Sequence, residues 1–162
     1  MKIASFIYEG RALYGLVEGD NLRPVSVSKL VDFPTLRALL GKGKLADLPI
    51  FCDSTTLPLA SVQLLSPVPH PSKILCVGLN YKKYYPVAGA TFEADNIVIF
   101  GRHDDSFVAP GQPLEMPLGD AGLSYDFEGE IAVVIGTRCR HVAAEAALVH
   151  VAGYACMNEG SV

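Results

Sequence analysis

Residues 125–135 read YDFEGEIAVVI and combine a row of acidic side chains with a continuous apolar run. The acids stand at every second position, at Asp126, Glu128 and Glu130. Successive side chains of a β-strand point to opposite faces, so the three carboxylates would share one face of a strand. Residues 131–135 have no polar face left, which predicts that the strand continues into a core buried on both sides.

Three carboxylates on one face of a strand repel one another, and burial would add a desolvation cost. A bound cation, a Lys or Arg partner, or plain exposure to solvent would each relieve that repulsion. Glu159 could add a further carboxylate, because it follows a predicted strand and opens a Gly-Ser turn. An all-oxygen ligand set favours the hard ions Mg²⁺, Mn²⁺ or Ca²⁺ over Zn²⁺. The spacing alone leaves these alternatives open.

The overall composition is that of an ordinary folded protein. The chain has 162 residues, of which 50% are hydrophobic and 19% are charged, and its net charge is −4. The absence of a basic cluster argues against nucleic acid as a partner. No apolar run approaches the roughly 18 residues of a membrane span, and charges at Glu9 and Arg11 come too early for a signal sequence. We therefore expect a cytoplasmic protein without membrane contact.

Two parts of the chain differ in pattern. Residues 3–25 alternate short β-type runs with turn signals, which predicts a three-stranded antiparallel meander. A short helix fits residues 33–40, and the Pro-rich residues 57–72 predict a linker or an extended crossing segment. Beyond this segment, the pattern predicts strands over residues 73–78, 97–100 and 154–157 and helices over residues 84–90 and 143–151.

Several blocks of the sequence together resemble the fumarylacetoacetate hydrolase family in their order and approximate spacing. They read KILCVGLNY at 73–81, FGRHDDSFVAPGQPL at 100–114, YDFEGEIAVVIG at 125–136 and GYACMNEGSV at 153–162. The fold class that this resemblance implies is α+β, mostly β. It implies a small N-terminal antiparallel β domain over residues 1–66, followed by part of a mixed-β catalytic domain over residues 67–162.

The resemblance also implies a metal-dependent hydrolase or lyase. In this family the Glu-x-Glu of the acidic strand binds a divalent metal, which implies Glu128 and Glu130 as ligands. Glu159 is implied as the third ligand, at a position where members usually have Asp. The implied cofactor is Mg²⁺, or else Mn²⁺ or Ca²⁺, and the implied assembly is a homodimer. Family members act on small 2-oxo acids and acylpyruvates, by carbon-carbon hydrolysis, decarboxylation, hydration or isomerisation through an enolate that the metal stabilises.

Further candidate catalytic residues follow from the same resemblance. Arg102 matches a basic position that could hold a substrate carboxylate, and Ser106 lies in the same block; the alternatives are a surface ion pair and a turn hydroxyl. Tyr84 and Val87 stand where hydrolytic members have a His and a Glu that activate water. Tyrosine is a poor general base near pH 7 because its pKa is about 10. His103 is a candidate replacement base, although a lone loop histidine is more often solvated.

Two function classes therefore compete. The first is a metal-dependent hydrolase or lyase of 2-oxo acids, in which decarboxylation or tautomerisation gains weight over hydrolysis. The second is a non-catalytic remnant or assembly subunit, indicated by Tyr84 and Val87. The relatives also continue beyond the block that ends at Val162, with an Arg-Asp pair, a substrate-binding Lys and a Gly-Thr-Pro loop. We therefore expect either a fragment of a longer protein or a short form that takes its cover from a partner chain.

Overall fold

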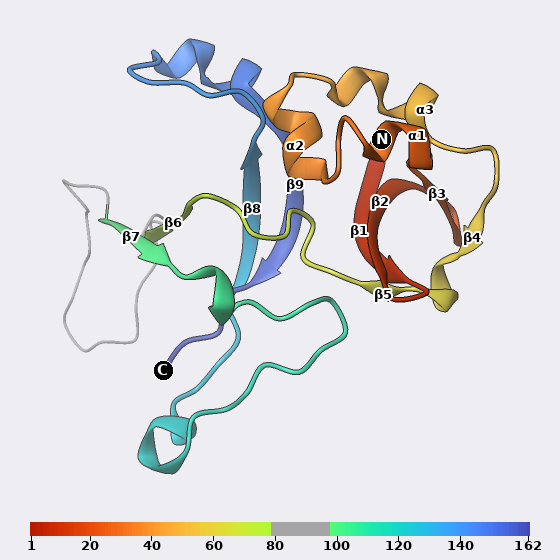
Figure 1. Cartoon of the computed structure of the whole chain (residues 1–162). Coiled ribbons are helices and arrows are strands. Elements are labelled where there is room, and N and C mark those ends of the chain that lie inside the picture. The colour runs from red at the N-terminus through yellow and green to blue at the C-terminus, as the bar shows by residue number, and fades with distance from the viewer. Residues whose placement is uncertain (79–97) are drawn as a thin grey trace. The chain divides into compact units, whose positions relative to one another are not determined.

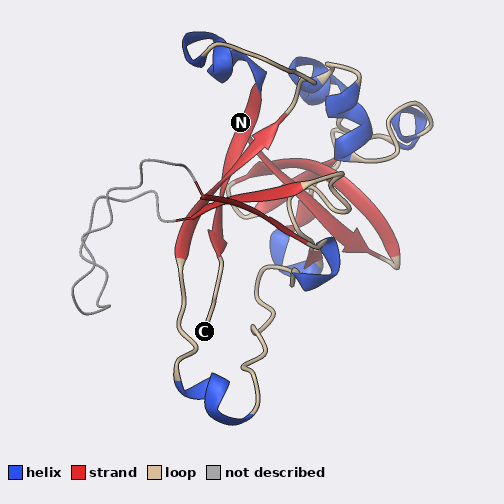
Figure 2. Cartoon of the chain, turned by 90° about the vertical axis from the view of Figure 1, so that its left-hand side faces the viewer, coloured by secondary structure: helices blue, strands red, loops and turns tan. Residues whose placement is uncertain are grey.

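The computed structural model of the chain describes residues 1–78 and 98–162 (Figure 1). The chain divides into two compact units, Met1–Pro69 with Val108–Val162, and His70–Phe107. Antiparallel strands dominate both units and the helices are short, which confirms the expected α+β, mostly β class (Figure 2). The division into domains at residues 66 and 67 stays a prediction.

The first unit contains a five-stranded antiparallel sheet in the order β4-β3-β2-β1-β5. The expected meander of three strands is confirmed, and the Pro-rich segment adds two short strands that the sequence pattern did not indicate. The strands are β1 (Lys2–Tyr8), β2 (Arg11–Glu18), β3 (Asn21–Pro24), β4 (Leu57–Pro58) and β5 (Gln63–Leu64). Between β4 and β5 lies the 3-10 helix η2 (Leu59–Ser61).

The tight turn between β1 and β2 explains the register of this sheet. Glu9 and Gly10 have φ values of 48° and 74°, the left-handed backbone that a two-residue hairpin turn requires at both central positions. Tyr8 therefore pairs with Arg11 and Lys2 with Val17. This register sets which side chains of β1 and β2 face the core.

Short helices cover the core of this sheet. They are α1 (Val27–Leu30), α2 (Leu36–Gly41), the 3-10 helix η1 (Leu45–Asp47) and α3 (Leu48–Phe51). Helix α2 begins three residues later than expected, because Thr35 is its N-cap and its Oγ1 accepts a hydrogen bond from the N–H of Ala38 at 3.1 Å. Leu39 of α2 and Tyr14 of β2 are almost completely buried in the core.

The same unit contains the hairpin of β8 (Gly129–Ile135) and β9 (Val151–Asn158). Val134 of β8 and Ala152 of β9 pack against the core cluster around Tyr14 and Leu39. The helix predicted over residues 143–151 is present as the 3-10 helix η5 (Ala144–His150), and η4 (Gly119–Leu123) precedes the acidic segment. The predicted strand at 154–157 is confirmed as part of the longer β9.

The expectations for residues 125–135 were wrong in two respects. The strand begins only at Gly129, and Asp126 forms an isolated bridge with Ser161 instead of a continuous ladder. The apolar run is not buried on both faces: Ile131 and Ile135 are 70% and 57% exposed. Among the described residues, β8 pairs with β9 alone and packs against the core through Val134 on one face, which leaves the other face open.

The second unit holds β6 (Ile74–Gly78), β7 (Val98–Arg102) and the 3-10 helix η3 (Asp104–Ser106). The two expected strands are confirmed as an antiparallel pair. Burial of β6 is limited, because Cys76 is buried while Leu75 is 65% exposed. The helix predicted at residues 84–90 lies outside the described residues.

Among the described residues, every helix is too short or too polar to cross a membrane. The cytoplasmic location expected from the sequence stays a prediction.

Candidate metal centre

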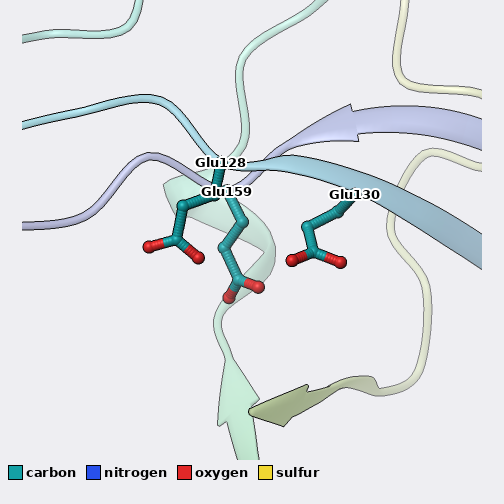
Figure 3. Close-up of side chains that lie close together, drawn as sticks. All are labelled: Glu128, Glu130 and Glu159. Atoms are coloured by element: carbon teal, nitrogen blue, oxygen red, sulfur yellow. The ribbon is translucent and has the colours of Figure 1, made fainter. Parts of the chain in front are cut away.

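Three carboxylates gather where β8 begins and β9 ends (Figure 3). Glu128 directly precedes β8, Glu130 lies in β8, and Glu159 directly follows β9. Because the two strands are antiparallel and Gly129 pairs with Asn158, the start of one strand meets the end of the other. One carboxylate oxygen of each Glu lies within 4.8 Å of the other two.

Backbone hydrogen bonds hold this junction together. The N–H of Glu159 donates to the carbonyl oxygen of Glu128 at 2.9 Å. The N–H of Glu128 donates to the side-chain oxygen of Asn158, also at 2.9 Å. One step further out, Asp126 and Ser161 exchange two backbone bonds, at 2.9 and 3.1 Å. The backbone at Glu128 and Glu159 is therefore fixed on both sides of the carboxylate cluster.

The side chain of Ser161 adds a contact to one carboxylate of the cluster. Its hydroxyl donates a hydrogen bond to Oε1 of Glu128. Asn158 and Ser161 were missed as site residues by the sequence reasoning, although both lie in the block that supplied Glu159. The signal that could have found them is their place in the turn after β9, where short polar side chains reach neighbouring backbone and carboxylate groups.

The sequence left three ways to relieve the repulsion among the carboxylates: a bound cation, a Lys or Arg partner, or exposure to solvent. The surroundings of the cluster bear on this choice. Within residues 1–78 and 98–162, neither Glu128 nor Glu130 forms an ion pair with a Lys or Arg. Glu128 is exposed, whereas Glu130 and Glu159 are half-buried. Two neighbouring carboxylates that are partly withdrawn from water repel each other, so a cation would stabilise this arrangement more than solvent alone.

The donor set fits a hard divalent cation. Carboxylate oxygens are the ligands of Mg²⁺ and Ca²⁺, at about 2.0–2.6 Å from the ion. Two ligands of one such ion lie at most about 4–5 Å apart, and the three oxygens here lie within 4.8 Å of one another. The arrangement can therefore close around a single ion by small side-chain rotations. Their role as metal ligands stays a prediction.

The remaining predicted site residues belong to the other unit, His70–Phe107. Ser106 lies in η3, and its hydroxyl donates to the carbonyl oxygen of His103 at 2.7 Å. This is the turn contact that the sequence analysis gave as the alternative to a catalytic role for Ser106. Arg102 ends β7, and its guanidinium carbon lies 5.9 Å from the ring centroid of Phe100. Tyr84 lies outside the described residues. Catalytic roles for all four residues stay predictions.

Two family models together match most of the chain. Residues 73–162 match the model described as "Fumarylacetoacetate (FAA) hydrolase C-terminal". Residues 1–67 match the model described as "Rv2993c-like, N-terminal". The first match alone covers more than half of the 162 residues.

Curated relatives share about a third of their aligned residues with this chain. Protein Rv2993c of Mycobacterium tuberculosis is 38% identical over 104 residues, which are 64% of this chain and 38% of that protein. The human mitochondrial oxaloacetate tautomerase FAHD2A is 34% identical over 105 residues, which are 65% of this chain and 32% of that protein. The chain thus aligns with less than half the length of these relatives.

Solved structures share the fold over nearly the whole chain. The fumarylacetoacetate hydrolase of psychrophilic Exiguobacterium antarcticum has a TM-score of 0.73 and 32% identity, and the match covers 99% of this chain and 56% of that one. The maleylpyruvate hydrolase of Sphingobium sp. SYK-6, solved with manganese (II) ion and pyruvate, has a TM-score of 0.67 and 24% identity. That match covers 99% of this chain and 58% of the other, and it shows a common fold.

Proposed function

Because this chain belongs to the fumarylacetoacetate hydrolase family, we propose that it carries the metal centre of an enzyme that acts on small 2-oxo acids or acylpyruvates. The observation that carries this proposal is the approach of Glu128, Glu130 and Glu159, with one oxygen of each within 4.8 Å of the other two. The similarity to a tautomerase and to hydrolases supports an enzyme as opposed to a binding module.

The cation that we propose is Mg²⁺ or Mn²⁺, with Ca²⁺ as the alternative. The manganese ion bound to the maleylpyruvate hydrolase of the same fold supports this choice. When bound, such a cation supplies Lewis-acid stabilisation to negative charge that develops on a keto oxygen. The three Glu side chains bind the cation, and the backbone bonds at Glu128 and Glu159 keep the carboxylates in place.

Other residues are proposed to bind the substrate. Arg102 presents a guanidinium that can hold a carboxylate through two parallel hydrogen bonds, which is the recognition that a 2-oxo acid needs. His103 is the proposed proton acceptor, and Ser106 fixes the backbone of His103 through its 2.7 Å bond. Tyr84 is a weak general base near neutral pH. Tautomerisation or decarboxylation of a 2-oxo acid is therefore proposed in preference to carbon-carbon hydrolysis.

An activity assay with separate metal steps tests this proposal. Oxaloacetate tautomerisation and decarboxylation, and acylpyruvate hydrolysis, are measured after chelation and again with Mg²⁺ or Mn²⁺ added. We expect activity on oxaloacetate that requires the cation and is lost in Glu130→Ala, while Glu115→Ala, an exposed acid outside the cluster, retains it. Demonstrated cation binding without activity on any 2-oxo acid would favour the alternative function.

The alternative is a non-catalytic assembly subunit, and one observation favours it. Ile131, Val133 and Ile135 alternate along β8 and are 70%, 50% and 57% exposed. A row of exposed apolar side chains on one strand face is typical of a surface that another chain or segment covers. We propose a homodimer as the first assembly to test, by sedimentation of the native chain and of Val133→Lys. A dimer without activity would support this function.

A further inference from the structure

The contact between Ser161 and Glu128 bears on which cation the centre selects. Ser161 donates its hydroxyl hydrogen to Oε1 of Glu128, one of the three clustered carboxylates. An ionised carboxylate has two oxygens and can bind a cation through one or through both. A neighbouring hydroxyl that engages one oxygen biases that choice. The inference below rests on the proposed metal centre.

The hydroxyl of Ser161 is held by the backbone around it. Asp126 and Ser161 exchange two backbone hydrogen bonds, at 2.9 and 3.1 Å, and form an isolated β-bridge. The turn before Ser161 is tight: a Cβ added at Gly160 would lie 2.5 Å from the hydroxyl oxygen of Tyr125. A side chain at position 160 would therefore displace the ring of Tyr125, whereas the two backbone bonds to Asp126 hold Ser161 in place.

Ser161 also restricts how the Glu128 carboxylate can turn. The backbone N–H of Glu128 is bound to Asn158 and its carbonyl oxygen to Glu159, both at 2.9 Å, so the main chain of Glu128 cannot shift to compensate. With Oε1 bound to Ser161, the second oxygen of Glu128 is the one left to approach a cation. Glu128 is thereby biased toward single-oxygen coordination.

This bias discriminates between divalent cations. Ca²⁺ takes six to eight oxygens and readily uses both oxygens of one carboxylate, whereas Mg²⁺ requires six in near-octahedral geometry at shorter distance. A carboxylate held to one oxygen suits the octahedral ion. We propose that Ser161 is a positioning residue that holds Glu128 as a single-oxygen ligand and so favours Mg²⁺ or Mn²⁺ over Ca²⁺ at this centre.

Calorimetric titration of the chain with Mg²⁺ and with Ca²⁺ tests the proposal. Removal of the hydroxyl in Ser161→Ala should lower the ratio of the Ca²⁺ dissociation constant to the Mg²⁺ dissociation constant by about tenfold, about the effect of one hydrogen bond to a charged group. Ser161→Thr, which keeps the hydroxyl, should restore the ratio. Ser124→Ala is the matched control, because the hydroxyl of Ser124 contacts the carbonyl oxygen of Ala121.

Infrared spectra of the carboxylate stretches supply a readout that a purely structural role would not move. The carboxylate bands that change when Mg²⁺ is added should include one with the splitting of single-oxygen coordination in the Mg²⁺-loaded chain. In Ser161→Ala loaded with Ca²⁺ it should change to two-oxygen coordination. If Ser161→Ala does not fold, the band of the unsubstituted chain decides, and two-oxygen coordination there would overturn the proposal.

The outcomes separate this inference from the proposed function. Binding by the unsubstituted chain with the same cation ratio in Ser161→Ala overturns the role of Ser161 and leaves the metal centre intact. Equal loss of affinity for both cations in Ser161→Ala makes Ser161 a structural residue and also overturns the role. Absence of binding to the unsubstituted chain overturns both proposals.

Discussion

Glu128 and Glu159 are far apart in the sequence, yet the N–H of Glu159 donates to the carbonyl oxygen of Glu128 at 2.9 Å. This bond continues the ladder of β8 and β9 by one step beyond the pair of Gly129 with Asn158. Two carboxylate-bearing residues therefore become neighbours through main-chain pairing. The stability of the hairpin and the geometry of the candidate metal centre are coupled for this reason.

Removal of one carboxylate from the cluster should abolish cation binding. Glu128→Ala and Glu130→Ala each remove one of the three carboxylates of the cluster, and Mg²⁺ and Mn²⁺ depend on such ligands. Calorimetry should find binding to the unsubstituted chain and to Glu115→Ala, and none to either variant. Unchanged affinity in both variants would mean that the acids are merely solvated.

Glu130→Gln should have opposite effects on stability with and without cation. In the absence of cation, the substitution removes one of three mutually repelling charges, so the melting temperature should rise by a few degrees, about the effect of 1 kcal/mol in a domain of this size. With Mg²⁺ in excess, the unsubstituted chain should gain stability by mass action and Glu130→Gln should not. Thermal melts at two cation concentrations measure both effects. If Glu130→Gln melts at a lower temperature than the unsubstituted chain in the absence of cation, repulsion among the three carboxylates is not the main effect of Glu130 on stability.

Asn158→Ala should lower the affinity for the cation although Asn158 is not one of the three proposed ligands. The side-chain oxygen of Asn158 accepts the N–H of Glu128 at 2.9 Å, so its loss leaves that donor without its partner and loosens the start of β8. Partners of this kind typically change metal affinity by about 10- to 100-fold when lost. Asn158→Asp keeps an acceptor at the same distance and should retain more affinity than Asn158→Ala. Calorimetry would contradict the prediction if the two variants bind equally.

Tyr14 should make stability fall at alkaline pH. Burial raises the pKa of Tyr14 from 10.0 to about 12, with a smaller contribution from the Cys52 charge. Between these two pH values the folded state holds the phenolic proton that the unfolded state has lost. The contribution of Tyr14 to the free energy of unfolding is therefore complete below pH 10 and is lost as pH rises toward 12.

Tyr14→Phe tests this pH dependence. The variant should show a flatter fall in the free energy of unfolding over that range. It should also lose about 1 kcal/mol at neutral pH, because the Tyr14 hydroxyl donates to the carbonyl oxygen of Phe33 at 2.9 Å. Denaturant unfolding of Tyr14→Phe and of Tyr154→Phe, whose ring is exposed, measures both effects. If the free energy of unfolding falls equally steeply with pH in the two variants, Tyr14 is not the group that causes the fall.

Restoring a His-Glu pair should raise hydrolysis selectively. The family resemblance predicts that Tyr84 and Val87, which both lie outside the described residues, take the positions of the pair that activates water in hydrolytic members. General-base help contributes typically 10²- to 10⁴-fold. Acylpyruvate hydrolysis should increase in the double variant Tyr84→His with Val87→Glu, while oxaloacetate chemistry changes little. The assay is run with Mg²⁺ or Mn²⁺ added. Fast hydrolysis by the unmodified protein would point to another base, with His103 the first to replace.

Local sequence patterns account for much of the fold. The alternation in residues 3–25 and the turn at Glu9 and Gly10 specify the meander, because hairpin register depends on residues that are close in sequence. The Glu-x-Glu spacing likewise places Glu128 and Glu130 on one side of an extended chain. The blocks from residue 73 onward identified the family that the comparisons support.

Tertiary structure decided what depends on pairing between distant segments. The Pro-rich residues 57–72 contribute β4 and β5 because β3 and β1 offer free edges, which no local pattern reveals. Among the described residues, the apolar run of β8 keeps one open face, because burial depends on which other segment covers it. Glu159 meets Glu128, and Ser161 binds its carboxylate, only through the antiparallel register of β8 and β9. A sequence encodes the residues of such a site, but a non-local hydrogen-bond ladder sets the distances between them.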